Sequence, residues 1–282
     1  MSTLTIRISN TALLAMLLTL SLFTGVVNGQ AFTDDPRPIP RTADGYVSFA
    51  GDPENIGNWN GPGPRGTLGD PVNPETRPEG ATVHNLDSNL SDADIPFLPW
   101  ARELFEERVG NSHKDEPYAQ CKPTGGPRLI LTPYGNEWLH LEDQQEIIFL
   151  GVGGPHTWRR IHMDGREHPE NPTPTRFGHS VGHWEGDSLV IDSVGFTTNF
   201  WLGRNGYPHT EQLHLIETIS RPSFDRLHYV ATVADPGAYT ETWSGGFWVN
   251  WLEDNEPFDY LCQENNISTI IMTAEDNNLN DQ

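Results

Sequence analysis

Histidines and carboxylates gather in the middle of the chain, in a pattern that suits acid–base or metal chemistry. Eight of the eleven histidines fall between positions 140 and 214: His140, His156, His162, His168, His179, His183, His209 and His214. Carboxylates are interleaved with them: Asp164, Glu185, Asp187, Asp192, Glu211 and Glu217. Imidazole with carboxylate is a common ligand set for zinc, iron or manganese, and a common pair for proton transfer near neutral pH.

Residues 163–169, with the sequence MDGREHP, form the first candidate segment. The Asp164-Gly165 pair is first of all typical of a hairpin turn. A turn does not require Arg166, whose guanidinium can bind a carboxylate through two parallel hydrogen bonds. Asp164 is therefore a candidate acid–base residue, and Arg166 a candidate for orienting an anionic group.

Residues 177–187, with the sequence FGHSVGHWEGD, form the second. A helix would place His179 and His183 on one face, but the glycines disfavour a helix. In an extended strand the two residues share a face about 13 Å apart, too far for one metal. The spacing is therefore weak evidence for a chelate, and the EGD triplet predicts a turn between two strands.

Residues 208–214, with the sequence PHTEQLH, form the third. A loop that leads into a strand would present His209 and Glu211 at its mouth, with His214 deeper along the strand. We expect His179, His209 and His214 to bind a divalent metal (zinc, iron or manganese) if the protein has one. Glu211 joins Asp164 as an acid–base candidate. The alternative is a solvated loop followed by a hydrogen-bonded histidine.

The elements that would position these residues are mostly short strands. Segments rich in Val, Ile, Trp and Phe, separated by Gly, Pro, Asn or Asp, predict strands. They are 128–132, 137–141, 146–152, 157–163, 188–194, 212–219, 227–233, 246–252 and 267–272. This pattern predicts a mainly β fold: an antiparallel meander that closes into a lipocalin-like barrel or forms a two-sheet sandwich.

Alternation along these strands leaves two interpretations open. Trp138 shares a face with His140, and Trp158 shares one with Arg160 and His162. Such faces either line a ligand cavity inside a barrel or lie on its wet outer surface. Trp248 and Trp251 are further cavity candidates, but a regular strand cannot turn both inward.

The N-terminal half is organised differently. Residues 1–29 resemble a secretory signal peptide: Arg7, an apolar run over 11–27, and a cleavage site after Gly29 or Ala31. A membrane anchor is the alternative, but the run is short of the ~20 residues that a span needs.

Residues 30–98 are rich in Pro and Gly and predict an extended arm, anchored by apolar side chains such as Phe49 and Trp59. A short helix is predicted over 99–109, at the start of a domain over 99–275, and a flexible tail over 276–282.

The charge balance and the two cysteines indicate which partners and which cellular compartment to expect. The chain has 17 Lys and Arg against 39 Asp and Glu, so it repels phosphate backbones and we expect no nucleic-acid partner. Outside the leader, no segment is apolar enough to span a membrane. Secretion places Cys121 and Cys262 in an oxidising compartment, which favours a disulfide over two separate thiols.

Several strings resemble a largely uncharacterised family of secreted bacterial β-rich proteins. They are GGPHTWRRIHMDGREHP, FGHSVGHWEGDSLVIDSVGF, PHTEQLHLIE, DPGAYTETW and YLCQENN, within residues 97–266. The clearest signature is G-H-S-x-G-x-W-E-G-D-[ST]-L-V. The resemblance implies a secreted β-rich domain and points to matched positions at Asp164, Arg166, His179, His209, Glu211 and His214. His162 and His183 fall at variable positions of the family.

Two functions follow from these features. The first is a secreted or periplasmic hydrolase or lyase that acts on a small organic substrate, because binding and catalytic groups concentrate on loops that flank strands. The second is a non-catalytic, lipocalin-like protein that binds a small apolar or aromatic ligand. Nucleotide, flavin and haem motifs are not evident in the sequence, which disfavours redox cofactors.

Overall fold

The structure is a computed structural model of the chain. It describes residues 35–51, 54–61, 83–85, 95–111, 114–132, 134–152, 157–204, 206–256, 259 and 261–262. The predicted signal peptide, the strand expected at 267–272 and the tail at 276–282 lie outside these residues.

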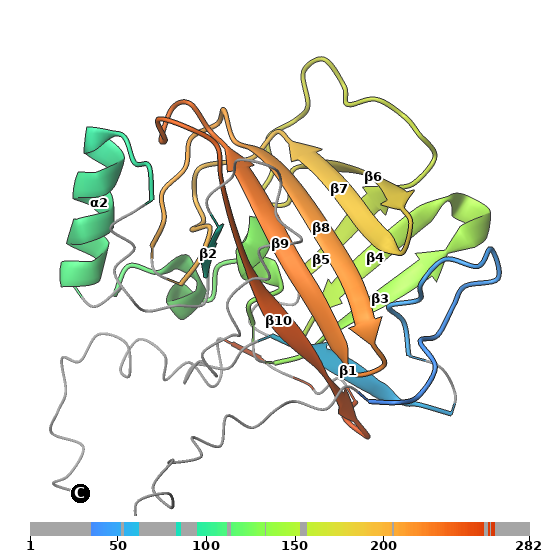
Figure 1. Cartoon of the computed structure of the whole chain (residues 1–282). Coiled ribbons are helices and arrows are strands. Elements are labelled where there is room, and N and C mark those ends of the chain that lie inside the picture. The colour runs from blue at the N-terminus through green and yellow to red at the C-terminus, as the bar shows by residue number, and fades with distance from the viewer. Residues whose placement is uncertain are drawn as a thin grey trace, which may run out of the picture. The chain divides into compact units, whose positions relative to one another are not determined.

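Ten strands form one sheet, and nine of them close into a barrel (Figure 1). The barrel strands are β1 (Gly57–Asn60), β3 (Asn136–Leu141), β4 (Glu146–Gly151), β5 (Thr157–His162), β6 (His179–Glu185), β7 (Ser188–Val194), β8 (His214–Ser223), β9 (Arg226–Ala234) and β10 (Trp243–Glu253). They follow one another in chain order, and pairing of β1 with β10 closes the ring. The short strand β2 (Val83–Asn85) runs parallel to β10 outside the ring. The mainly β fold is thus confirmed in its barrel form.

One pair of barrel strands departs from the expected antiparallel meander. Strands β5 and β6 are parallel, with Ile161 opposite Ser180 and His162 opposite Val181. A parallel pair needs a connection that returns the chain to the starting end of the first strand. Residues 163–178 make this return, as the yellow-green loop beside β6 and β7 in Figure 1.

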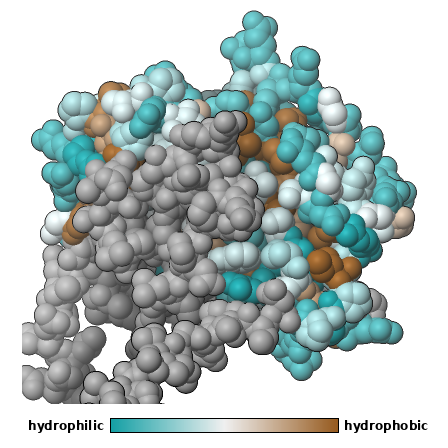
Figure 2. Space-filling view, viewed as in Figure 1, coloured by the Kyte–Doolittle hydropathy of each residue, from teal (hydrophilic) through white to brown (hydrophobic). Residues whose placement is uncertain are grey.

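The barrel interior is packed with side chains rather than open as a ligand cavity. Alternating residues of each strand point inward, and large aromatic residues among them are almost fully buried: Trp59, Trp138, Phe149, Tyr229 and Phe247. Trp251 also lies inside, whereas Trp158 is 56% exposed, so Trp158 belongs to the outer surface and does not line a cavity. On the face seen in Figure 2, the coloured surface is mainly hydrophilic with separate hydrophobic patches.

A charged pair lies within this packed interior. Arg159 of β5 binds Glu217 of β8 through two hydrogen bonds of 3.0 and 2.5 Å, and both side chains are buried. Ser180 and Ser193 accept hydrogen bonds from Arg159, and the Tyr229 hydroxyl donates to Glu217 at 2.8 Å. Five strands therefore meet at one buried polar network, which compensates both charges for their loss of water.

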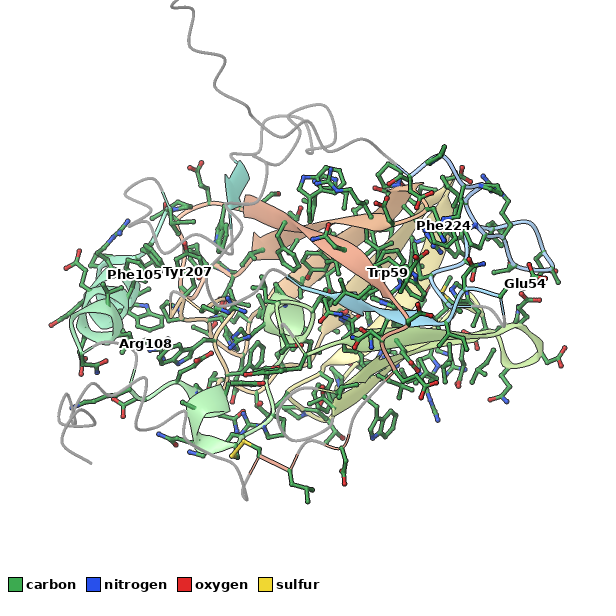
Figure 3. The ribbon with its side chains drawn as sticks, turned by 90° about the horizontal axis from the view of Figure 1, so that it is seen from below. Glu54, Trp59, Phe105, Arg108, Tyr207 and Phe224 are labelled. Atoms are coloured by element: carbon green, nitrogen blue, oxygen red, sulfur yellow. A yellow bond between two sulfur atoms is a disulfide. The ribbon has the colours of Figure 1, made fainter. Side chains whose placement is uncertain are left out.

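The segment expected as an arm is part of the barrel. It contributes β1, and its Phe49 and Trp59 side chains are fully buried. The indole of Trp59 donates to the Phe49 carbonyl at 2.6 Å, and Figure 3 shows Trp59 at the barrel strands. The barrel domain therefore begins well before residue 99.

The remaining elements surround the barrel. The helix predicted over 99–109 is confirmed as α2 (Pro99–Gly110), which buries Ala101 and Phe105. The Phe105 ring packs against the Tyr207 ring (Figure 3). Arg108 donates a hydrogen bond to the carbonyl of Gly206, the residue before Tyr207. Instead of the strand expected over 128–132, the chain forms a 3-10 helix (Gly126–Leu129), because Pro127 and the positive φ of Gly126 favour a turn.

The predicted disulfide is confirmed. Cys121 and Cys262 are bonded across 141 residues and tie the segment after β10 to the loop after a 3-10 helix (Pro117–Gln120). Among the described residues, no helix has the length and apolarity that a membrane span requires.

Candidate functional site

The outer face of β6, β7 and β8 carries polar side chains that point away from the barrel interior. Ser180, Ser193 and Leu215 are buried inside the barrel, so the side chains next to them in sequence point outward. These are His179 at the start of β6, Asp192 on β7 and His214 at the start of β8. In the β7–β8 register Asp192 lies opposite Ile216, which makes His214 its diagonal neighbour.

The long β5–β6 connection adds a histidine to this face. Nδ1 of His168 lies 2.8 Å from Nδ1 of His179, and Nε2 of His168 lies 3.1 Å from Oδ1 of Asp192. Nε2 of His214 lies 2.7 Å from the same Asp192 oxygen. We call these four residues, His179, His168, Asp192 and His214, the histidine relay.

The hydrogen-bond partners assign the tautomers within the relay. An ionised carboxylate only accepts, so His168 and His214 each carry a proton on Nε2 when neutral. Nδ1 of His168 is then a bare acceptor, and His179 must donate to it from its own Nδ1. This leaves Nε2 of His179 with a free lone pair, the atom that a general base uses.

The surroundings of His179 favour its neutral form. Partial burial lowers its pKa, and the neighbouring His168, His162 and Arg166 lower it further. The His162 ring lies 5.3 Å from the His179 ring, and burial with the nearby Arg166 charge also lowers the pKa of His162. These neighbours therefore favour the uncharged imidazole of His179.

Two glycines of the GHSxG motif allow this arrangement. Gly178 has φ of +67°, and a Cβ there would lie 2.8 Å from the Val194 carbonyl oxygen. A Cβ on Gly182 would lie 2.7 Å from the Met163 sulfur and 2.8 Å from the Ile161 side chain. The first glycine turns the chain into β6 beside β7, and the second lets the end of β5 pack closely against β6.

Asp164 and Arg166 lie beside the relay but bind each other. Both Asp164 oxygens accept hydrogen bonds from the Arg166 guanidinium, and this pairing lowers the pKa of Asp164 to about 2. Arg166 therefore does not present a free fork to a ligand in this arrangement. Its charge still acts on His162 and His179.

The other predicted residues lie elsewhere. His209 is buried, with its ring nitrogens 3.1 Å from the Phe200 carbonyl and 3.2 Å from the Thr210 carbonyl. It packs on the Phe200 ring at 4.2 Å between centroids. Glu211 is exposed and, with His209 and Trp100, lines a separate cavity of about 570 Å³.

The expected metal set is consequently divided. His179 and His214 both belong to the relay, whereas the described contacts of His209 are backbone carbonyls and a phenyl ring. Within the described ranges, no group of three or more His, Cys, Asp or Glu side chains is arranged to hold a metal ion. The residues present do not fit the predicted three-histidine centre.

Asp192 and His168 are the relay members that the sequence-based selection omits. Strand alternation provides a signal for Asp192, because it and His214 fall on the same outer face of adjacent strands. His168 has no comparable signal, because only the folded path of residues 163–178 brings it to β6 and β7.

No protein-family model, curated protein or solved structure matches the chain. The resemblance to the secreted bacterial family therefore stays a prediction.

Proposed function

We propose that the protein is a secreted or periplasmic enzyme of the hydrolase or lyase type, acting on a small organic substrate by proton transfer at His179. The observation that carries the proposal is the pair of contacts from His179 to His168 (2.8 Å) and from His168 to Asp192 (3.1 Å). An imidazole base supported by a second group and a carboxylate follows the logic of a catalytic triad.

The relay supports both reaction types through one step. In hydrolysis, Nε2 of His179 takes a proton from a water molecule, whose oxygen attacks the substrate carbonyl, and then returns the proton to the departing group. In elimination, Nε2 takes a proton from a carbon next to an electron-withdrawing group, and the C–H electrons form the double bond as the leaving group departs with its own bonding electrons. The positive charge that forms on His179 is stabilised through His168 by the Asp192 carboxylate. His214 holds the same carboxylate in place. A general base of this kind raises the reaction rate about 10²–10⁴-fold.

The proposed compartment has two supports. Residues 1–29 have the pattern of a cleavable signal peptide. The Cys121–Cys262 disulfide suits an oxidising compartment outside the cytosol.

The relay is tested by substitution in the mature protein, screened against a panel of esters, lactones and β-elimination substrates. We expect His179→Gln and Asp192→Asn each to lower turnover about 10²–10⁴-fold, since the first removes the base and the second removes the carboxylate that supports it. The matched control is His183→Gln, because His183 lies on the same strand but is exposed and contacts only Glu185 among its described hydrogen-bond partners. Turnover that survives His179→Gln, or that falls equally in the control, contradicts the proposal.

The second candidate is a non-catalytic protein that binds a small apolar or aromatic ligand. The closed barrel supports it, because barrels of this kind hold small ligands. Since Trp59, Trp138 and Tyr229 occupy the interior, such a ligand would bind at the end of the barrel rather than inside it. Tight binding of apolar dyes with no turnover on the panel would favour this candidate.

A further inference from the structure

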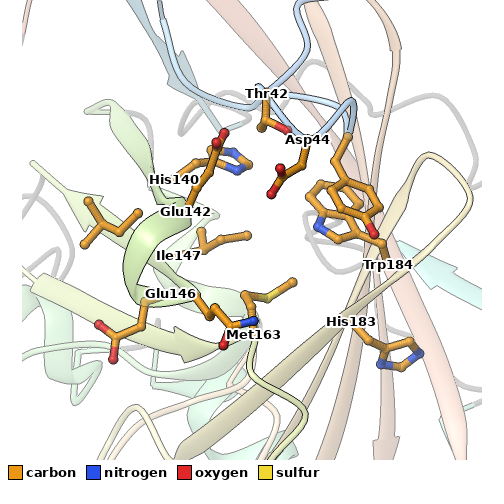
Figure 4. A pocket seen from close by; sticks show the side chains of 12 residues that line it. Thr42, Asp44, His140, Glu142, Glu146, Ile147, Met163, His183 and Trp184 are labelled. Atoms are coloured by element: carbon orange, nitrogen blue, oxygen red, sulfur yellow. The ribbon is translucent and has the colours of Figure 1, made fainter.

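A cavity of about 460 Å³ lies at one end of the barrel, apart from the relay contacts (Figure 4). The β3–β4 turn forms one side, with Glu142. The Trp184 end of β6 forms the opposite side, and the segment over 42–46 lies across the top with Thr42 and Asp44. We call this hollow the rim pocket. Its volume is within the range of small-molecule sites.

One wall of the rim pocket is aromatic. The Tyr46 and Trp184 rings are stacked 5.1 Å apart with an interplanar angle of 8°, and His140 lies 6.3 Å from Trp184 at 15°. Tyr46 remains 43% exposed, so part of its side chain stays accessible to an occupant. His140 adds no charge near neutral pH, because burial lowers its pKa to about 4 and its Nε2 accepts from the Phe49 amide.

The other sides of the rim pocket are anionic. Asp44, Glu142 and Glu146 line the pocket, and none of the described residues that line it is a lysine or an arginine. Glu146 is balanced by Arg160 at 3.3 Å, whereas the described hydrogen bond of Glu142 comes from the Ala43 amide. Thr42, on the same rim, has a buried hydroxyl oxygen without a hydrogen-bond partner among the described residues.

The segment over 42–46 is fastened on both sides of the pocket. Arg41 binds Asp187 in the β6–β7 turn through two contacts of 2.8 Å, and the Ala43 amide binds Glu142 in the β3–β4 turn. These contacts hold Asp44 and Tyr46 over the hollow, and so they preorganise the aromatic and anionic walls.

We propose that the rim pocket binds a small organic cation with a flat apolar body, such as an arylalkylamine. The exposed part of the Tyr46 ring, held in place by its stacking on Trp184, attracts a cation and packs against a planar body. Glu142 and Asp44 pair with the positive group, and the pocket repels anions of the same shape. This inference goes beyond the proposed catalysis and does not depend on it.

Three compounds that share an indole ring provide the test: tryptamine (cation), tryptophol (neutral) and indole-3-acetate (anion). By titration calorimetry on the mature protein, we expect tryptamine to bind at least tenfold more tightly than tryptophol, with indole-3-acetate weakest. Rising salt should weaken tryptamine binding more than tryptophol binding. Equal binding of tryptamine and tryptophol, preference for indole-3-acetate, or no tryptamine binding at millimolar concentration overturns the inference.

Variants locate the binding within the pocket. Glu142→Gln is expected to weaken tryptamine binding about tenfold without changing tryptophol binding, and Trp184→Leu to weaken both. The matched control for charge is Glu241→Gln, an exposed carboxylate outside the pocket, which should change neither. Thermal melting checks that Trp184→Leu is folded, and Glu142→Gln keeps the test decisive if it is not. His179→Gln separates the two proposals, because it should lower turnover about 10²–10⁴-fold while tryptamine binding stays unchanged.

Discussion

At the scale of single residues, the relay depends on where protons reside. Asp192 accepts from His168 and His214, so the lone pair at the far end of the relay belongs to Nε2 of His179. Sequence reasoning selects His179 and His214, but it does not join them, because neither contacts the other directly. The catalytic roles expected for Asp164, Arg166 and Glu211 stay predictions, whereas His209 lies apart from His179 and His214 and does not complete the expected metal centre.

The lowered pKa of His179 predicts the pH dependence of the proposed reaction. A base is active only when unprotonated, and burial shifts this pKa below the ordinary histidine value of about 6.5. We therefore expect the acid limb of kcat/KM to have its midpoint below 6.5, with a tenfold decline per pH unit at lower pH. A pH–rate profile on a substrate found in the panel measures this. An acid limb with its midpoint above 6.5 would show that another group is the base.

At the scale of elements, the relay depends on the β5–β6 connection, because this connection places His168 between His179 and Asp192. Alternation of apolar residues predicts the strands β3, β4, β5, β7, β8, β9 and β10, and the EGD turn predicts the β6–β7 hairpin, which Gly186 and Asp187 form. The parallel β5–β6 pair is not predictable in the same way. Residues 163–178 lack a periodic pattern, and their return path depends on contacts with β6 and β7 that are distant in sequence.

A substitution at Gly178 tests how closely the end of the β5–β6 connection packs against β7. Gly178→Ala adds a Cβ at a positive φ and within 2.8 Å of the Val194 carbonyl, so the start of β6 and His179 must shift. We expect a loss of about 2–3 kcal/mol in unfolding free energy, measured by urea titration, together with lower turnover. Gly186→Ala is the matched control: its φ is +60° but a Cβ there meets nothing within 4 Å. A loss no larger than the control's would show that the contact is unimportant.

At the scale of the whole molecule, the barrel is held by a packed aromatic interior with one charged network across five strands. The sequence predicts a barrel or a sandwich but cannot choose, because β1 lies in a Pro/Gly-rich segment that reads as an arm. Closure by the β1–β10 pair settles the choice in favour of the barrel. Alternation likewise leaves inside and outside undecided for Trp158 until the strands are assembled.

The Arg159–Glu217 pair predicts a large cost for removing one partner. Glu217→Gln leaves the buried Arg159 charge uncompensated and weakens the Tyr229 contact. We expect a loss of about 3–5 kcal/mol in unfolding free energy by denaturant titration. The double variant Arg159→Met with Glu217→Leu should lose clearly less, because no buried charge remains. If the double variant loses as much unfolding free energy as Glu217→Gln, the uncompensated charge is not the cause of the loss.

The most direct test of the relay is the protonation of its histidines, read from long-range ¹H–¹⁵N spectra of the mature protein at pH 7.5. Single variants at positions 168, 179 and 214 assign the signals. The relay predicts His179 protonated on Nδ1 with a bare Nε2, and His168 and His214 protonated on Nε2. A proton on Nε2 of His179, or on Nδ1 of His168, would contradict it, because the base would then lack either its lone pair or its support.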